Sequence, residues 1–324
     1  MTQPSHAPNG VTIRLERPED EAAVIRLWHL RSPDLPKTTI EEYRGFIATV
    51  PEGIPWHRLV AEHNGEVIAT GNALTKFWVA NSGSTVITVF VRPEQRNRGV
   101  GGAMYSALEI AAREFGSERL FTDVRENQPD GLRFAQERGF EPTDHVVRLS
   151  RLEVSAAQYD GYDGLEERLR GQGITVKTLA QLGADDEDVL REWHHIEIET
   201  AKDEPTSEAF NISFEVWRDS VMKMPGVSPD ATFAALHGGR IVGVTKVQRE
   251  GEDAGWHAGM GVLREFRGQG VARLLKWHSI QWARNNGLAY LYTGNDKQNP
   301  RMYSINQRLG YVPLPGTMEL VRTI

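Results

Sequence analysis

The chain carries one short motif twice: Arg96-Asn97-Arg98-Gly99-Val100-Gly101 in the first half and Arg267-Gly268-Gln269-Gly270-Val271-Ala272 in the second. Each copy follows an apolar stretch typical of a strand, residues 85–91 or 256–263, and precedes a stretch with helical periodicity. Glycines permit positive φ and a close approach of a ligand. Because the free N–H groups of a helix N-terminus favour an anion, each motif predicts a pyrophosphate site. Arg96, Arg98 and Arg267 add charge-assisted donors.

The motif also has a purely structural interpretation, in which its glycines serve only the packing of a strand-to-helix turn. Two copies at equivalent positions weaken that interpretation. The G-x-G-x-x-G fingerprint of dinucleotide binding is absent at both places, and no G-x-x-x-x-G-K-[ST] loop follows a strand. The sequence therefore argues against a Rossmann NAD site and against P-loop nucleotide hydrolysis.

The elements around the two motifs recur in the same order, about 170 residues apart. Each half predicts a strand, an amphipathic helix, a hairpin, a strand, the motif with its helix, another strand, a shorter helix and a final strand. This order gives an α/β fold with a mixed sheet covered by helices, duplicated in tandem. The predicted strands are residues 11–15, 59–62, 67–71, 85–91, 119–124 and 146–152, then 174–179, 233–236, 241–244, 256–263, 289–293 and 317–321.

Periodicity breaks near residues 153–162, which places the domain boundary there. We predict a short disordered tail at residues 1–10, a first domain at 11–154 and a second domain at 155–324. Each domain is long enough to bury its own core.

Composition excludes several chemistries. The 324 residues contain no cysteine, which rules out disulfides, thiolate metal sites and cysteine nucleophiles. The formal net charge of -7 argues against a basic nucleic-acid footprint and favours a cationic acceptor over an anionic one. No apolar run approaches the roughly 18 residues of a membrane span, and the N-terminus lacks a signal-peptide pattern. We expect a cytoplasmic protein that binds neither membrane nor nucleic acid.

Both motifs resemble the [Q/R]-x-x-G-x-[G/A] acyl-CoA signature of the GCN5-related N-acetyltransferases, the GNAT family. Residues 91–94 and 262–265 look like the end of that family's fourth strand. Residues 299–311, with the ending Leu309-Gly310-Tyr311, are similar to its last helix and LGF-type ending. The resemblance extends from about Val11 to Leu320, and the arrangement is similar to mycothiol synthase-like double-GNAT proteins.

The resemblance implies two tandem GNAT domains of α/β (α+β) class, each with a mixed, mostly antiparallel, splayed sheet flanked by helices. It implies acetyl-CoA as co-substrate and no metal. A main-chain N–H near the end of strand four would polarise the acetyl carbonyl, and a neutral amine would attack directly. The implied contacts are Gly261, Val262, Leu263, Arg267, Gly268, Gln269, Gly270, Val271, Ala272 and Asn299 in the second domain, and Val89, Phe90, Val91, Arg96, Asn97, Arg98, Gly99, Val100 and Gly101 in the first.

The sequence departs from the family at the general acid. Many members place a tyrosine four residues before the glycine of the LGF-type ending, where this chain has Ala135 and Asn306. Tyr303 lies about one helical turn from Asn306 and is the candidate acid. The alternatives are that Tyr303 is a packing residue and that solvent protonates the leaving thiolate.

The candidate bases lie only in the second half. His257 stands on the predicted strand and has a suitable intrinsic pKa, although a packed or exposed histidine is the simpler interpretation. Glu199 belongs to an acidic segment with Glu197, Asp203 and Glu204 that could remove a proton through water or simply be a solvated helix end. Because the first half has neither acid nor base, we expect the second domain to be the catalytic copy.

The leading hypothesis is an acyl-CoA-dependent N-acetyltransferase acting on a small amine, with a cationic amine such as an aminoglycoside or polyamine favoured. The alternatives are a catalytically idle acyl-CoA-binding or interaction module, which the missing tyrosine motivates, and a protein-lysine acetyltransferase. The sequence leaves the acceptor and the oligomeric state open.

Overall fold

The computed structural model describes residues 8, 10–79, 83–158, 162 and 164–324, so most of the predicted tail lies outside the described residues. The chain divides into two compact units. Unit 1 contains residues 1–144 and 317–324, and unit 2 contains residues 145–316.

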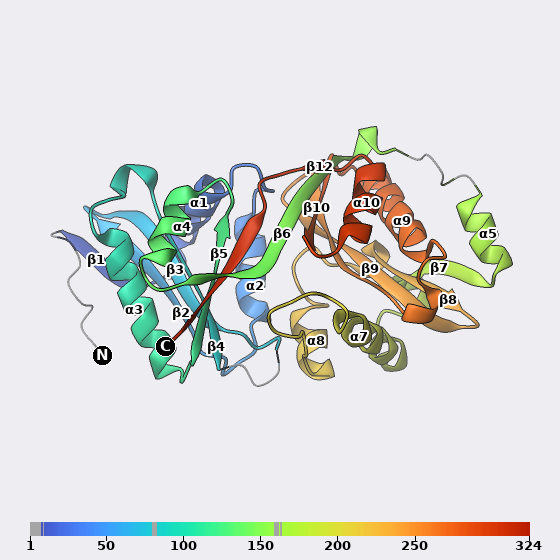
Figure 1. The fold of residues 1–324 in the computed structure, drawn as a ribbon, viewed down its shortest axis with the longest axis horizontal. Helices are drawn as coiled ribbons and strands as arrows, with labels where there is room; N and C mark the ends of the chain where they lie inside the picture. The colour runs from blue at the N-terminus through green and yellow to red at the C-terminus, as the bar shows by residue number, and fades with distance from the viewer. Residues whose placement is uncertain (1–7, 9, 80–82, 159–161, 163) are drawn as a thin grey trace. The chain divides into compact units, whose positions relative to one another are not determined.

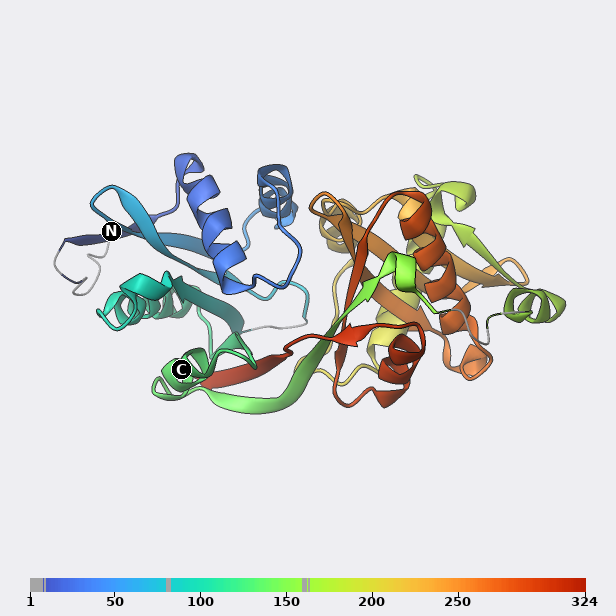
Figure 2. The same ribbon diagram turned by 90° about the horizontal axis from the view of Figure 1, so that it is seen from above.

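Unit 1 is a mixed sheet with helices on both faces. Its strands follow the order β1-β2-β3-β4-β5-β13, in which the β4–β5 pair is parallel and the other pairs are antiparallel. Helices α1 and α2 cover one face, and α3 and α4 cover the other (Figures 1 and 2). The bounds are β1 Val11–Leu15, α1 Glu21–Arg31, α2 Ile40–Thr49, β2 Trp56–His63, β3 Glu66–Thr75, β4 Ser84–Val91, α3 Val100–Glu114, β5 Arg119–Arg125, α4 Pro129–Gln136 and β13 Thr317–Thr323.

Unit 2 repeats this design. Its strands follow the order β6-β11-β10-β9-β8-β7, with β10 and β11 parallel and the other pairs antiparallel. Helices α9 and α10 lie on one side of the strands β8–β10, and α7 and α8 lie on the other (Figure 1). The bounds are β6 Glu141–Glu153, α5 Leu165–Gly171, β7 Ile174–Thr178, α6 Leu179–Leu182, α7 Glu187–Ala201, α8 Phe214–Ser220, β8 Thr232–His237, β9 Arg240–Glu250, β10 Ala254–Val262, α9 Val271–Asn285, β11 Tyr290–Asp296, α10 Pro300–Arg308 and the short β12 Val312–Pro313, which pairs with β6.

The division into domains differs from the predicted 11–154 and 155–324. The last strand of the first repeat, β6, pairs with β11 of the second repeat, and the last strand of the chain, β13, pairs with β5 of the first. Each sheet is therefore completed by the final strand of the other repeat. Because the repeats are homologous, the two final strands have similar patterns, and neither pattern specifies which sheet the strand joins.

Local sequence accounts for the turns and helix starts. Asn64 and Gly65 have φ of 50° and 78°, and Gly238 and Gly239 have φ of 58° and 84°, as the tight hairpin turns require. Helices α2 and α8 were not among the elements expected from the sequence. A threonine or serine caps each of them: the side chains of Thr39 and Ser213 accept backbone N–H groups of the first turn.

The core of unit 2 encloses a cluster of titratable side chains. His257 on β10 is buried, and its Nδ1 lies 2.7 Å from the hydroxyl oxygen of Tyr311. Lys276 on α9 is only 2% exposed, and its Nζ lies 5.3 Å from the centre of the Tyr311 ring. Burial lowers the pKa of Lys276 to about 7 and lowers the pKa of His257 well below its ordinary value. The fold therefore favours the uncharged form of both groups, and Lys276 loses its proton as the pH rises above about 7.

The buried amine makes the stability of the protein depend on pH. Between pH 7 and pH 9 the unfolded chain keeps a proton on Lys276 that the folded chain releases, so stability rises with pH over this range. The substitution Lys276→Met keeps the length of the side chain and removes this proton. We expect it to raise the melting temperature at pH 7 by roughly 5 °C and to flatten the pH dependence, as measured by scanning calorimetry.

Lys177→Met, at an exposed position on β7, is the matched control and should leave the wild-type slope unchanged. A Lys276→Met protein that melts below the wild type at pH 7, or keeps its slope, would contradict this account.

Candidate functional site

The site in unit 2 begins where two parallel strands part. β10 and β11 pair only from Ala254–Tyr290 to Trp256–Tyr292. Beyond this point β11 continues to pair with β6, and β10 continues to pair with β9. From His257 onward, the edge of β10 that faced β11 has no strand partner among the described residues. Free backbone groups on such an edge can bind a ligand.

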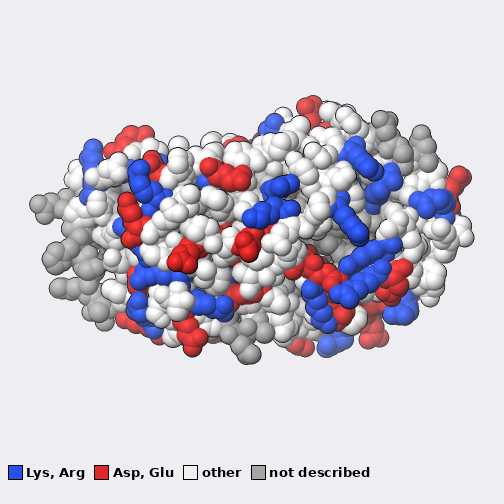
Figure 3. Space-filling model, viewed as in Figure 1, with Lys and Arg blue, Asp and Glu red and all other residues white. Residues whose placement is uncertain are grey.

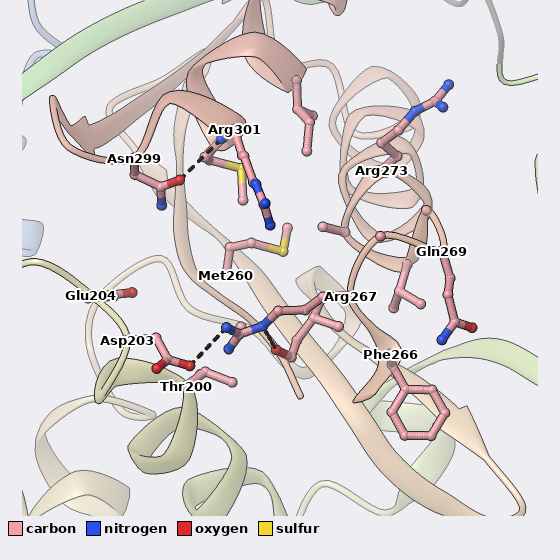
Figure 4. Close-up of a pocket in the computed structure, with 18 of the residues that line it drawn as sticks. Thr200, Asp203, Glu204, Met260, Phe266, Arg267, Gln269, Arg273, Asn299 and Arg301 are labelled. Carbon is pink, nitrogen blue, oxygen red and sulfur yellow. Dashed lines mark hydrogen bonds and ion pairs between the residues drawn. The ribbon is translucent and has the colours of Figure 1, made fainter. Parts of the chain in front are cut away.

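A cavity of about 670 Å³ lies between the end of β10, the motif loop and α10 (Figure 4). Figure 3 shows basic side chains gathered around a hollow over the α9 and α10 part of unit 2. The residues that line the cavity come from α5, the end of α7, β10, the motif, α9 and α10. They are Arg168, Thr200, Asp203, Glu204, Pro205, Met260, Gly261, Val262, Phe266, Arg267, Gly268, Gln269, Gly270, Val271, Ala272, Arg273, Gln298, Asn299, Arg301, Met302 and Ile305.

The two copies of the motif share one backbone conformation. The second and fourth residues are left-handed in both, with φ of 58° at Asn97, 83° at Gly99, 77° at Gly268 and 105° at Gly270. Each fourth residue is the N-cap of the following helix. Within the described residues, the amides of Gly268 and Gly270 have no backbone acceptor. The loops thus present free N–H groups at a helix N-terminus, as the anion-site prediction requires.

The first arginine of each motif ties its loop to the preceding strand. Nε of Arg96 donates to the carbonyl of Val91 at 3.1 Å, and Nε of Arg267 donates to the carbonyl of Val262 at 2.7 Å. Arg267 also forms an ion pair with Asp203, with Nη1 2.8 Å from Oδ2 (Figure 4). These bonds hold the guanidinium groups of the two arginines in place beside their loops.

Asp203 is the acidic partner of two arginines. Arg264 and Arg267 both bond to its carboxylate, and the hydrogen bonds from Arg264 are the largest cause of a pKa well below the usual range. Asp203 therefore stays ionised at every physiological pH.

The end of β10 contains a bulge. Its pairing with β9 shifts register between Ala258 and Gly261, and Gly259 has a φ of 58°. A bulge leaves one residue outside the ladder and turns its backbone groups away from the partner strand. A Cβ on Gly261 would overlap the side chain of Thr200, so glycine is required there for α7 to approach β10. In unit 1, β3 and β4 stay in register from Ala69–Val91 to Thr75–Thr85.

The structure brings together nearly all of the contacts predicted in the second half. Gly261, Val262, all six motif residues from Arg267 to Ala272, and Asn299 line the cavity. Leu263 is not in the wall and packs against the core instead. The first-half residues Val89, Phe90, Val91 and Arg96 to Gly101 form the equivalent strand end and loop, where Arg96 lies over the Phe90 ring at 5.4 Å.

The three predicted catalytic side chains lie outside the cavity wall. His257 is buried, with its Nδ1 2.7 Å from the hydroxyl oxygen of Tyr311. The ring of Tyr303 has the guanidinium of Arg148 5.1 Å from its centre. Glu199 pairs with Lys202, whose hydrogen bond lowers the pKa of the carboxylate and weakens it as a base. The catalytic roles expected of these three side chains stay predictions from the sequence, and the lining of the cavity does not support them. Strand and helix positions alone did not reveal which side chains face the cavity.

Glu204 is the acidic residue that does reach the cavity. Figure 4 shows its carboxylate directed towards the cavity from the segment after α7. The residue is exposed overall, yet the protein atoms that crowd its carboxylate raise its pKa, and the charge of Glu197 adds to this effect. The sequence pointed to this acidic segment as a source of a base, but nothing in the sequence distinguished Glu204 from Glu199 as the residue that reaches the cavity.

Two further cavity residues lie outside the predicted set. Arg168 comes from α5, and Arg301 points into the cavity from α10 (Figure 4). Among the described residues there is no group of three His, Asp or Glu side chains that could hold a metal ion. The described helices also include none with the length and apolar character needed to cross a membrane.

Comparison with known proteins gives a family. The model of the Acetyltransferase (GNAT) family matches residues 23–140 and 187–311. No curated protein matches the chain. A solved GCN5-related N-acetyltransferase from Sphaerobacter thermophilus is 19% identical with a TM-score of 0.73, and the match covers 98% of this chain and 97% of that one.

Two other solved structures span nearly the whole chain. A tandem GNAT protein from the clavulanic acid biosynthesis pathway is 17% identical with a TM-score of 0.75, covering 97% of this chain and 98% of that one. A fungal multi-domain GH3 β-N-acetylglucosaminidase with a glucosamine N-acetyltransferase region is 14% identical with a TM-score of 0.71, covering 97% of this chain and 38% of that one.

At these identities the structural likeness shows the fold alone. The family match is independent of it, covers more than half of the chain and includes both motif loops. Together with the two splayed sheets, it shows that the chain belongs to the acetyltransferase (GNAT) family and is a tandem protein with two GNAT repeats.

Proposed function

We propose that the chain transfers an acetyl group from acetyl-CoA to a primary amine, and that unit 2 is the catalytic copy. The family supports an N-acetyltransferase that uses acetyl-CoA. We assign catalysis to unit 2 because of the bulge at Gly259. This bulge opens the end of β10 beside the cavity and has no counterpart in β4.

The cavity offers groups for each part of the co-substrate. The free N–H groups of Gly268 and Gly270 would hold the diphosphate at the positive end of α9. The open edge of β10 at Gly261 and Val262 would pair with the amides of the pantetheine arm. Acetyl-CoA supplies the thioester carbonyl that the amine attacks.

A backbone N–H at the bulge would donate to the thioester oxygen as negative charge develops there. Such a donor is fixed by the fold before the reaction and needs no reorganisation, which is the main source of its catalytic effect. Gly259 allows this geometry because a Cβ there would lie 2.9 Å from Nζ of Lys246. Lys246 is itself held by Glu197, with Nζ 2.8 Å from Oε1.

Glu204 is the proposed proton acceptor. It lines the cavity, and its raised pKa makes it a stronger base than an ordinary carboxylate. For the leaving thiolate we propose protonation by water. Asn306, at the position of the family tyrosine, is buried and donates its amide to Asn295 at 2.5 Å, so it has no acidic proton to supply.

The acceptor is proposed to be a small cationic amine. Glu204 places a carboxylate on the α7 side of the cavity, and the net charge of -7 would attract a cation. Aminoglycosides, polyamines and glucosamine are suitable members of a first panel, the last because a region with this fold in the fungal relative is described as a glucosamine N-acetyltransferase.

A thiol assay tests the proposal directly. Because the chain has no cysteine, a thiol reagent reports released CoA without background from the protein. Amine-dependent release supports the proposal. Tight binding of acetyl-CoA without release on any amine would favour the idle binding module, and release only on peptides would favour a protein-lysine acetyltransferase.

If only unit 2 is catalytic, the same substitution in the two motif loops should have unequal effects on turnover. Gly99 and Gly270 both have left-handed backbone conformations, so valine at either position strains the backbone of its loop. At Gly270 the added Cβ would also lie 2.9 Å from Cδ1 of Leu165. We expect Gly270→Val to lower turnover by about 100-fold, because a displaced loop misplaces the thioester. Gly99→Val should keep turnover within about twofold of wild type. Thermal unfolding establishes that both variants fold, and equal losses of turnover would refute the assignment to unit 2.

The proposed role of Glu204 predicts how the rate of acetyl transfer depends on pH. The rate should rise with pH through the pKa of Glu204, which lies above that of an ordinary carboxyl group, because only the ionised form accepts a proton. Glu204→Gln should lower kcat by about 100-fold and remove this rise from the pH profile. Glu199→Gln, in the same acidic segment but outside the cavity wall, is the control and should change kcat by less than about twofold. A Glu204→Gln enzyme with the wild-type pH profile would exclude this residue as the base.

A further inference from the structure

Helix α5 lies directly on the motif loop of unit 2. Its residues Leu165 and Leu169 are buried in the core, which fixes the helix in place. A Cβ built on Gly270 would lie 2.9 Å from Cδ1 of Leu165 and 3.3 Å from Nη2 of Arg168. Nη2 of Arg168 also donates to the carbonyl of Gln269 at 3.1 Å. The helix thus positions an arginine against the loop whose free N–H groups face an anion.

Helix α5 lies outside the residues that the family model matches. The family match begins at residue 187, after α5 ends at Gly171. At the equivalent loop of unit 1, the atom closest to a Cβ on Gly99 belongs to Pro8, at 3.4 Å. The first loop therefore has a proline where the second has the guanidinium of Arg168.

Arg168 differs from most of the other arginines of the cavity in having spare donors. Arg267 is paired with Asp203, and Arg273 lies over the Tyr162 ring at 4.7 Å and points away from the cavity in Figure 4. Arg168 is exposed, lines the cavity and has no acidic partner within the described parts of the chain. Its one hydrogen bond, to the carbonyl of Gln269, leaves the other guanidinium N–H groups available.

We propose that Arg168 is a phosphate-binding residue of unit 2, which α5 adds beside the motif loop so that its guanidinium and the backbone N–H groups of the loop hold the phosphates of the bound acyl-CoA. An arginine bonded to the loop carbonyl is already oriented, so little side-chain freedom is lost when it binds the phosphate. The inference rests on the proposed function, since it takes acyl-CoA as the ligand. Two kinds of phosphate could be bound, the diphosphate and the 3′-phosphate of the ribose.

Binding measurements on Arg168→Ala test the inference. We expect the Kd for acetyl-CoA, measured by calorimetry on the full chain, to rise about 10-fold, as for the loss of a charge-assisted hydrogen bond. Arg170→Ala is the matched control, because Arg170 lies on the same helix, is exposed and pairs with Glu166. Its Kd should stay within about twofold of wild type. Equal weakening by both variants would show a general charge effect and overturn the proposal.

Two further ligands separate a phosphate contact from mere support of the loop. S-acetylpantetheine has no nucleotide phosphates, so wild type and Arg168→Ala should bind it equally; weaker binding by the variant would mean that Arg168 only supports the loop and would overturn the proposal. With acetyl-dephospho-CoA, an unchanged 10-fold difference places Arg168 on the diphosphate, and a lost difference places it on the 3′-phosphate. An unaltered Kd for acetyl-CoA in Arg168→Ala would refute the inference alone, whereas absence of acetyl-CoA binding by the wild type would refute the proposed function.

Discussion

The short parallel contact between β10 and β11 is the constraint on which the site depends. The two strands pair as far as Trp256 and Tyr292 and then separate. After they separate, each strand keeps a hydrogen-bonded partner on its other edge, because β11 still pairs with β6 and β10 still pairs with β9. The inner edge of β10 is thereby free for a ligand, and the motif loop that follows β10 places the N-terminus of α9 at the same opening. The open edge of β10 and the exposed N-terminus of α9 are therefore consequences of one geometry.

The two repeats keep this geometry to different degrees. Unit 1 has the same short parallel contact, between Ser84–Val86 and Arg119–Phe121, and the same left-handed positions in its loop. It lacks the register shift that opens β10 at Gly259. A duplicated domain can lose a bulge without losing its fold, since the regular ladder that replaces it is at least as well hydrogen-bonded. The two units thus share the loop conformation, and they differ in the register shift at the end of the fourth strand of the repeat.

Charge in the cavity is arranged in two parts. The loop, α5 and α10 supply N–H groups and arginines, whereas the segment after α7 supplies Asp203 and Glu204. The ion pair between Asp203 and Arg267 joins the two parts in the unliganded protein. An anionic co-substrate and a cationic acceptor would each find the opposite charge on its own side, which favours their correct orientation over the reverse one.

The sequence by itself determined the repeat, the order of the elements, the family resemblance and most of the loop contacts. These follow from local rules: alternation and helical periodicity fix the elements, and glycines at set positions fix the loop. Only the tertiary structure decided that β6 and β13 exchange sheets, that His257 and Lys276 share a buried cluster, and that Glu204 and Arg168 reach the cavity. Such facts depend on which side chains distant segments bring together, and a homologous repeat offers each strand two equally suitable partners, so local pattern cannot choose between them.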